Sequence, residues 1–148
     1  MLATTHSLAS ALIVSKIPSP ALSLPLVIIF HYLLDLIPHW DTGTGLTNGK
    51  KTKRKALFYT IVDLVIAGSS VYFLFQLNKP FWPILWVGVL LGIMPDILEF
   101  PALFLNFRPF PINVLEKFHS EIMHRSSSFP LGLIPQIIII AIILIITH

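Results

Sequence analysis

The feature that most limits the fold of this chain is a set of long apolar blocks that carry almost no charge. A helix needs about 20 apolar residues to cross a bilayer, and about 17 is the lower limit. Four blocks reach or approach that length, namely 21–37, 56–77, 81–100 and Phe129–Thr147. The sequence therefore predicts an all-α integral membrane protein, built as a compact bundle of four spanning helices.

Composition supports this class. The chain has 148 residues, of which 55% are hydrophobic and 11% charged, against a usual charged share of about 25%. A soluble domain of this size could not bury so much apolar surface. The length predicts a single domain over residues 1–148. Because the chain has no cysteine, any metal must be bound by His, Asp or Glu.

A shorter apolar segment, residues 8–17, precedes the first block and ends at Pro18 and Pro20. It is too short to cross alone, so we expect a half-crossing or re-entrant helix. It also resembles the core of a signal peptide. No Lys or Arg precedes it, however, and no small-x-small cleavage site follows.

The basic residues give the expected orientation. Half of the ten lie within residues 50–55, and the positive-inside rule places that loop in the cytoplasm of a prokaryotic cell. Such a loop is typical of contact with anionic lipid headgroups, so we expect no nucleic-acid partner. If the helices cross the membrane in alternating directions, two basic residues lie outside, namely Lys16 and Lys79. The others lie inside, namely Lys50, Lys51, Lys53, Arg54, Lys55, Arg108, Lys117 and Arg125.

The same alternation brings most acidic and histidine side chains to one membrane depth, toward the cytoplasmic face. A carboxylate inside a bilayer costs a few kcal/mol unless it is paired, protonated or bound to a cation. Asp35, Asp63 and Asp96 have no basic residue near them in their own segments. A divalent metal is a compact source of the missing positive charge.

Residue spacing also favours a metal site. His31 and Asp35 are four residues apart and Asp96 and Glu99 are three apart, so each pair shares a helix face. Helical bundles build metal sites from such pairs. A nitrogen and oxygen ligand set suits Zn²⁺ or Mn²⁺ better than Mg²⁺. In the alternative interpretation, His31 makes only an interhelical hydrogen bond.

Two residues after the first block also have simpler interpretations. His39 follows Pro38 and could lie at the headgroup level beside Trp40, and Asp41 could cap a turn.

Three stretches resemble motifs of the YdjM-type family of bacterial and archaeal inner-membrane proteins, which are described as membrane-bound metal-dependent hydrolases. They are His31-Tyr-Leu-Leu-Asp35, Gly92-Ile-Met-Pro95-Asp96 and His124-Arg125. Thr5-His6 resembles the opening histidine of that family.

The chain departs from the family pattern at three positions. Leu98 stands where a second aspartate is expected, and Glu99 replaces the histidine after it. Phe129 stands where the His-Arg element has its second histidine, for which His119 is a substitute.

The residues and the resemblance together predict a membrane-embedded, metal-dependent hydrolase that acts on a lipid-linked or membrane-borne ester, such as a phosphoester. Asp63 or Glu99 would be a ligand or general base, and His124 with Arg125 would bind an anionic headgroup. The expected metal ligands are His6, His31, Asp35, Asp96 and His119.

Two other functions remain open at this point. The acids and histidines could form a proton or cation relay in a small transporter or channel subunit. The chain could also be a degenerate family member that serves as a membrane binding partner. The expected partners are membrane lipids or a lipid-linked substrate, and a second copy of the chain is a further candidate.

Overall fold

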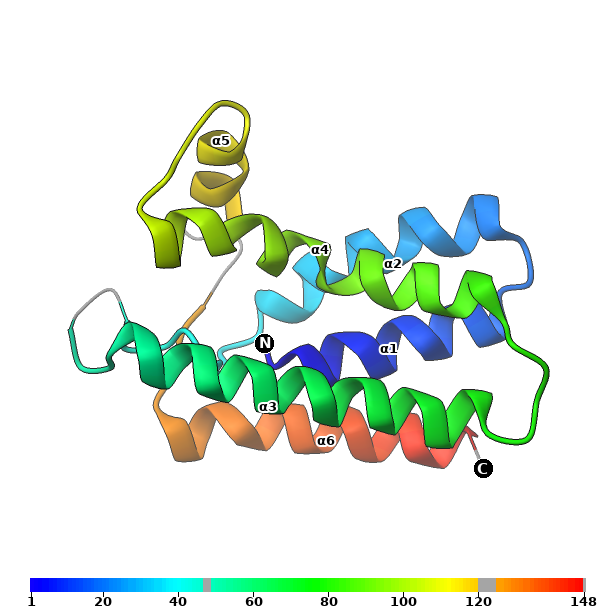
Figure 1. Cartoon of the computed structure of the whole chain (residues 1–148). Coiled ribbons are helices and arrows are strands. Elements are labelled where there is room, and N and C mark those ends of the chain that lie inside the picture. The colour runs from blue at the N-terminus through cyan, green and yellow to red at the C-terminus, as the bar shows by residue number, and fades with distance from the viewer. Residues whose placement is uncertain (47–48, 120–124, 148) are drawn as a thin grey trace.

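A computed structural model describes residues 1–46, 49–119 and 125–147. In these residues the only extended pairing is an isolated bridge between His39 and Ser126, and the rest is helix, turn or loop (Figure 1). The elements in chain order are α1 (Ala3–Lys16), α2 (Pro20–Asp35), α3 (Lys53–Val71), the π-helical turn η1 (Tyr72–Gln76), α4 (Pro83–Leu105), α5 (Ile112–Lys117) and α6 (Phe129–Thr147).

Three helical segments are long and apolar enough to cross a membrane: Lys53–Gln76, Pro83–Leu105 and Phe129–Thr147. Their outward side chains include Val65 and Ile137, both more than 60% exposed. Apolar residues so exposed are suited to lipid contact. The expected fourth span is not confirmed, because α2 is a shorter apolar helix of 16 residues.

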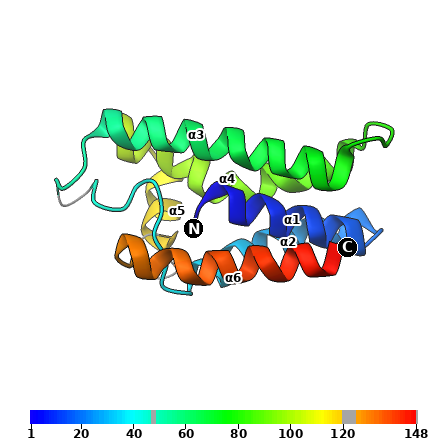
Figure 2. The ribbon, with the colours of Figure 1, turned by 90° about the horizontal axis from the view of Figure 1, so that it is seen from below.

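Helix α1 is the central element of the bundle and packs against α2, α3, α4 and α6 (Figures 1 and 2). Its 14 residues correspond to about 21 Å, less than the bilayer core of about 30 Å. It begins at Ala3, earlier than the predicted residue 8. The reason is that polar residues 4–7 lie buried inside the bundle instead of forming a surface loop.

Glycines on α4 allow α1 to approach closely. A Cβ atom at Gly92 would overlap the Ser10 Oγ atom, and one at Gly88 would lie 2.5 Å from Val14 Cγ2. Small residues at helix contacts are the usual way in which membrane helices pack, because lipid provides no hydrophobic force between them. Gly92 is therefore required by the α1–α4 contact.

The side chain of Gln136 in α6 connects the start of α1 to the rest of the bundle by hydrogen bonds. Its Oε1 atom accepts a hydrogen bond from the Leu2 amide at 2.8 Å. Its Nε2 atom donates to the carbonyls of Trp40 and Gly132 at 2.7 and 2.8 Å. These contacts hold the α2–α3 loop, α6 and the start of α1 together.

Candidate metal centre

Four side chains from separate parts of the chain meet beside the start of α1. His31 and Asp35 lie on the last turns of α2, Asp96 lies on α4, and His119 follows α5 by two residues. One potential ligand atom from each residue lies within 4.8 Å of the others, so this group can hold a metal ion. Ligands about 2.1 Å from an ion at tetrahedral angles are about 3.4 Å apart.

The distances within the group are close to that spacing. Asp35 Oδ2 lies 2.8 Å from His119 Nε2 and 3.2 Å from His31 Nε2. Asp96 Oδ1 lies 3.8 and 4.0 Å from the same two nitrogens. Three of the side chains are almost fully buried, whereas the Asp96 side chain is 34% exposed. The Asp96 carboxylate is therefore the member of the group that water or a ligand can reach.

The orientation of His31 is fixed by α4. Its Nδ1 atom lies 2.7 Å from the Gly92 carbonyl oxygen, which can only accept, so Nδ1 carries the proton. The Nε2 lone pair then points toward Asp35 and Asp96, and Nε2 has no hydrogen-bond partner among the described residues. A backbone carbonyl that fixes the imidazole in this way is typical of histidines that bind metals.

His119 lies between two carboxylates. Its Nδ1 atom is 2.8 Å from Glu99 Oε1, and its Nε2 atom is 2.8 Å from Asp35 Oδ2. Burial lowers the pKa of His119, but the hydrogen bonds with Asp35 and Glu99 outweigh that effect and raise this pKa to about 10. A metal ion would replace the Nε2 proton, while Nδ1–H would still donate to Glu99. Glu99 therefore orients His119 and does not itself contact the position of the ion.

The other oxygen of Asp35 meets a different set of groups. Asp35 Oδ1 lies 3.2 Å from His6 Nε2 and 3.5 Å from His39 Nε2, and the Met1 nitrogen donates to it. The predicted ligand His6 thus contacts Asp35 but lies outside the group formed by His31, Asp96 and His119.

Asp63 lies apart from these residues and stabilises the start of α1. Its carboxylate accepts hydrogen bonds from the amides of Ala3 and Thr4 at 2.6 and 3.2 Å, and from Thr4 Oγ1 at 2.6 Å. The first amides of a helix have no partner within the helix, and a carboxylate there is favourable. These contacts describe a helix cap from α3, whereas the sequence suggested a ligand or base.

The backbone of the segment after residue 124 forms hydrogen bonds with the backbone around Asp35 and His39. The His39 amide donates to the Arg125 carbonyl at 2.9 Å, and the Arg125 amide donates to the Asp35 carbonyl at 3.2 Å. The Arg125 side chain itself is exposed. His124, predicted to bind a headgroup, lies outside the described residues.

Sequence reasoning missed the place of His39 and Asp41. His39 is fully buried, and its Nε2 atom lies 3.7 Å from Asp41 Oδ2. The predicted turn is present, because Asp41 Oδ1 accepts from the Thr44 amide at 2.5 Å. The available signal was that Asp35 and His39 repeat the four-residue spacing of His31 and Asp35.

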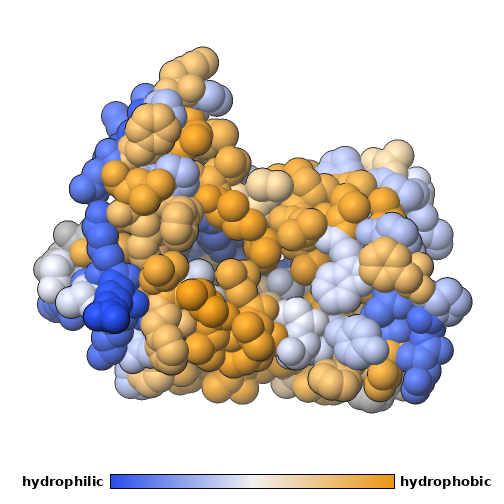
Figure 3. All heavy atoms as spheres, viewed as in Figure 1, coloured by the Kyte–Doolittle hydropathy of each residue, from blue (hydrophilic) through white to orange (hydrophobic). Residues whose placement is uncertain are grey.

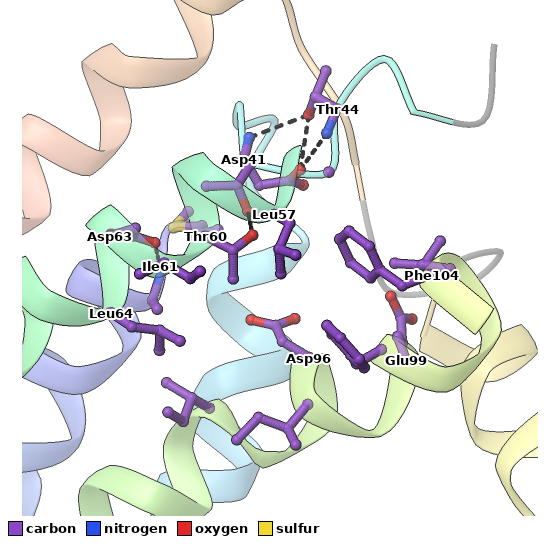
Figure 4. Close-up of a pocket in the computed structure, with 18 of the residues that line it drawn as sticks. Asp41, Thr44, Leu57, Thr60, Ile61, Asp63, Leu64, Asp96, Glu99 and Phe104 are labelled. Carbon is purple, nitrogen blue, oxygen red and sulfur yellow. Dashed lines mark hydrogen bonds between the residues drawn. The ribbon is translucent and has the colours of Figure 1, made fainter. Parts of the chain in front are cut away.

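A cavity of about 640 Å³ opens between α3 and α4 beside these residues. Its walls include Leu57 and Ile61 of α3 and Phe104 of α4, and its polar lining includes Asp41 and Asp96 (Figure 4). On the surface in Figure 3, the hollow between α3 and α4 has a hydrophobic rim and more polar atoms in its depth. The cavity therefore reaches the metal-binding group at Asp96.

Comparison of the chain with protein-family models, curated proteins and solved structures found no match. The resemblance to the YdjM-type family stays an expectation, and the function is inferred from the geometry.

Proposed function

We propose that this protein is a membrane-embedded, divalent-metal-dependent hydrolase that cleaves a phosphoester carried by a lipid. The single observation that carries the proposal is the group of His31, Asp35, Asp96 and His119, whose member Asp96 also lines a cavity with apolar walls. Two imidazoles and two carboxylates form a ligand set that suits Zn²⁺ or Mn²⁺.

The bound ion would lower the pKa of a water molecule and polarise the ester oxygen. In hydrolysis the water oxygen bonds to phosphorus, and the bond from phosphorus to the leaving alcohol breaks. The electron pair of that bond stays on the leaving oxygen, which takes up a proton. The partly exposed Asp96 carboxylate would accept the proton that the water releases.

The cavity supports a lipid as the carrier of the ester. Leu57 and Ile61 on one wall and Phe100 on the other offer apolar contact along its length. Both walls belong to segments that are apolar enough to lie in a bilayer. An acyl or prenyl chain between α3 and α4 would place its phosphate beside Asp96.

We further propose that the site faces the cytoplasm of a prokaryotic cell. The α2–α3 loop and the first turn of α3, which together carry half of the basic residues, lie with α5 at the end of the bundle near the metal-binding group (Figure 1). The positive-inside rule favours that end as cytoplasmic. The same basic loop would attract anionic lipids to the site.

A proton or cation relay is the second candidate, and one observation favours it. Glu99, His119, Asp35 and His6 are joined in an unbroken series of contacts between 2.8 and 3.2 Å. Such series of acids and histidines carry protons in membrane pumps.

The test begins with protein purified in detergent without chelator. We expect elemental analysis to find at least one Zn²⁺ or Mn²⁺ per chain, and we expect phosphate release from phosphatidic acid or a polyprenyl phosphate in mixed micelles. Asp96→Asn should abolish release. Glu116→Gln is the matched control, because that buried carboxylate pairs with Arg108 at 3.5 Å instead.

The absence of metal from the wild-type protein would defeat the proposal. Full metal content without hydrolysis of any lipid phosphate would favour a binding partner that lacks activity. Proton flux in liposomes without stoichiometric metal would favour the relay.

A further inference from the structure

We propose that the centre is dinuclear, with a second divalent cation bound by His6, His39 and Asp41 on the opposite side of Asp35. The Asp35 carboxylate would bridge the two ions. This inference rests on the proposed function, because the two sites share Asp35.

The first support is the way in which the two Asp35 oxygens divide their neighbours. Oδ2 faces His119 at 2.8 Å and His31 at 3.2 Å. Oδ1 faces His6 at 3.2 Å and His39 at 3.5 Å. A carboxylate that serves one imidazole pair with each oxygen has the arrangement of a bridging ligand, and bridged ions in two-metal sites lie about 3.5–4 Å apart.

The second support is the fixed orientation of His39. Its Nδ1 atom lies 2.8 Å from the Ile37 carbonyl oxygen, so Nδ1 donates and the Nε2 lone pair faces Asp35 and Asp41. The Asp41 Oδ2 atom lies 3.7 Å from that Nε2 atom. His31 is oriented by the Gly92 carbonyl in the same way. In both sites a backbone carbonyl oxygen therefore fixes the orientation of an imidazole.

The third support is that each site receives the same kinds of ligand. The second set has the imidazoles of His6 and His39 with the carboxylates of Asp35 and Asp41, and the first set also has two imidazoles and two carboxylates. The ligand spacings of 3.2, 3.5 and 3.7 Å are close to the separation of about 3.4 Å between ligands at tetrahedral angles.

The Met1 nitrogen already lies at the second position. The Met1 nitrogen donates to Asp35 Oδ1 and lies 3.0 Å from His6 Nε2. A cation bound by His6 and Asp35 would take over these two contacts. The second ion would therefore compete with the Met1 nitrogen for this side of Asp35.

The consequence for the substrate is a preference for phosphate groups. Asp41 and Asp96 belong to different ion positions, yet both line the same cavity. Two ions that face one cavity can bind two oxygens of a single phosphoryl group, and can stabilise both the attacking and the leaving oxygen. Before attack, a carboxylic ester offers only its carbonyl oxygen as a non-bridging oxygen. The second ion therefore supports the phosphoester that is already proposed as the substrate.

The experiment counts Mn²⁺ ions per folded chain and records their electron paramagnetic resonance spectrum. We expect two ions in the wild-type protein, with the spectrum of a spin-coupled pair. His39→Ala should reduce the count to one and abolish the coupling. Asp41→Asn is the milder second variant, because an Asn Oδ1 atom can still accept from the Thr44 amide, and it should weaken binding of the second ion alone.

The outcomes separate the two proposals. A wild-type protein without any bound ion contradicts the proposed function as a whole. One ion in the wild-type protein, unchanged in folded His39→Ala and Asp41→Asn, contradicts the second site and leaves the first. If His39→Ala fails to fold, the spin coupling in Asp41→Asn decides, and coupling equal to wild type overturns the proposal.

Discussion

Both halves of α1 bury side chains, but the buried side chains near its start are mostly polar and those nearer its end are mostly aliphatic. The first half carries Thr4, Thr5 and His6, which lie inside the bundle among charged and amide groups. The second half carries Ala11 and Val14 and belongs to the aliphatic core. The comparison teaches that depth within this bundle does not decide polarity, because polar and aliphatic side chains of one helix are both buried.

The polar half also carries an energetic cost that the aliphatic half does not. His6 Nδ1 and Ser7 Oγ are buried without a hydrogen-bond partner among the described residues. A buried polar atom without a partner costs about 1–3 kcal/mol. Residues that reduce stability in this way are typical of functional sites, which agrees with the candidate metal site beside His6.

The largest effect is expected for Asp35→Asn, which changes the α2 carboxylate that His6 of the polar half contacts. The amide cannot bridge imidazoles and ions as the carboxylate does, so metal affinity should fall by more than about 1000-fold, or about 4 kcal/mol. Isothermal titration with Zn²⁺ measures this. Glu116→Gln serves again as the control, and undiminished affinity in Asp35→Asn would remove the metal centre.

Leu85→Ala, on α4, tests the aliphatic core to which the second half of α1 belongs. Leu85 is fully buried, and the cavity left by truncation should lower the free energy of unfolding by about 2–4 kcal/mol. Denaturation in mixed micelles measures the change, and the metal content of the folded fraction should stay at the wild-type value. A loss of metal without a loss of stability would show that the halves are not separate.

Glu99→Gln probes the orientation of His119. Without a carboxylate on Nδ1, affinity for the ion should fall by about 10–100-fold, as for other residues that orient metal-bound histidines. Zn²⁺ titration again gives the value, and the unfolding midpoint of the metal-free protein serves as the control for stability. Complete loss of the ion would instead make Glu99 a direct ligand.

Asp63→Asn is expected to have the smallest effect. The Asn side chain retains one acceptor oxygen for the backbone amides at the start of α1. The free energy of unfolding should therefore fall by about 1 kcal/mol, the size of a helix-cap change. The affinity for Zn²⁺ should not change. A clear drop in affinity would restore Asp63 to the metal-binding role that the sequence suggested.

Much of the fold was predictable from the local sequence. Segment length and composition gave the three long apolar helices, and the breaks at Pro18 and Pro20 gave a first helix too short to cross. The fourth span was not confirmed, since apolar composition continued beyond Asp35, where α2 ends. Composition alone does not say where a helix stops.

The candidate site was predictable only where its ligands share a helix. The spacing of His31 and Asp35 is visible in the sequence, and the structure brings both together with Asp96 and His119. The contact of Asp63 with the start of α1 depends on how α1 and α3 pack, which no spacing encodes. The position of His39 depends likewise on a backbone pairing with Arg125, far away in the chain.

Gly92 makes helix packing and metal chemistry depend on one another. Its missing side chain leaves room for Ser10 of α1, and its carbonyl oxygen holds the ring of His31. A shift of α4 along or away from α1 would therefore also rotate an imidazole that faces the ion. Changes in bilayer thickness that tilt α4 would reach the candidate metal site through this residue, without any contact between lipid and the site.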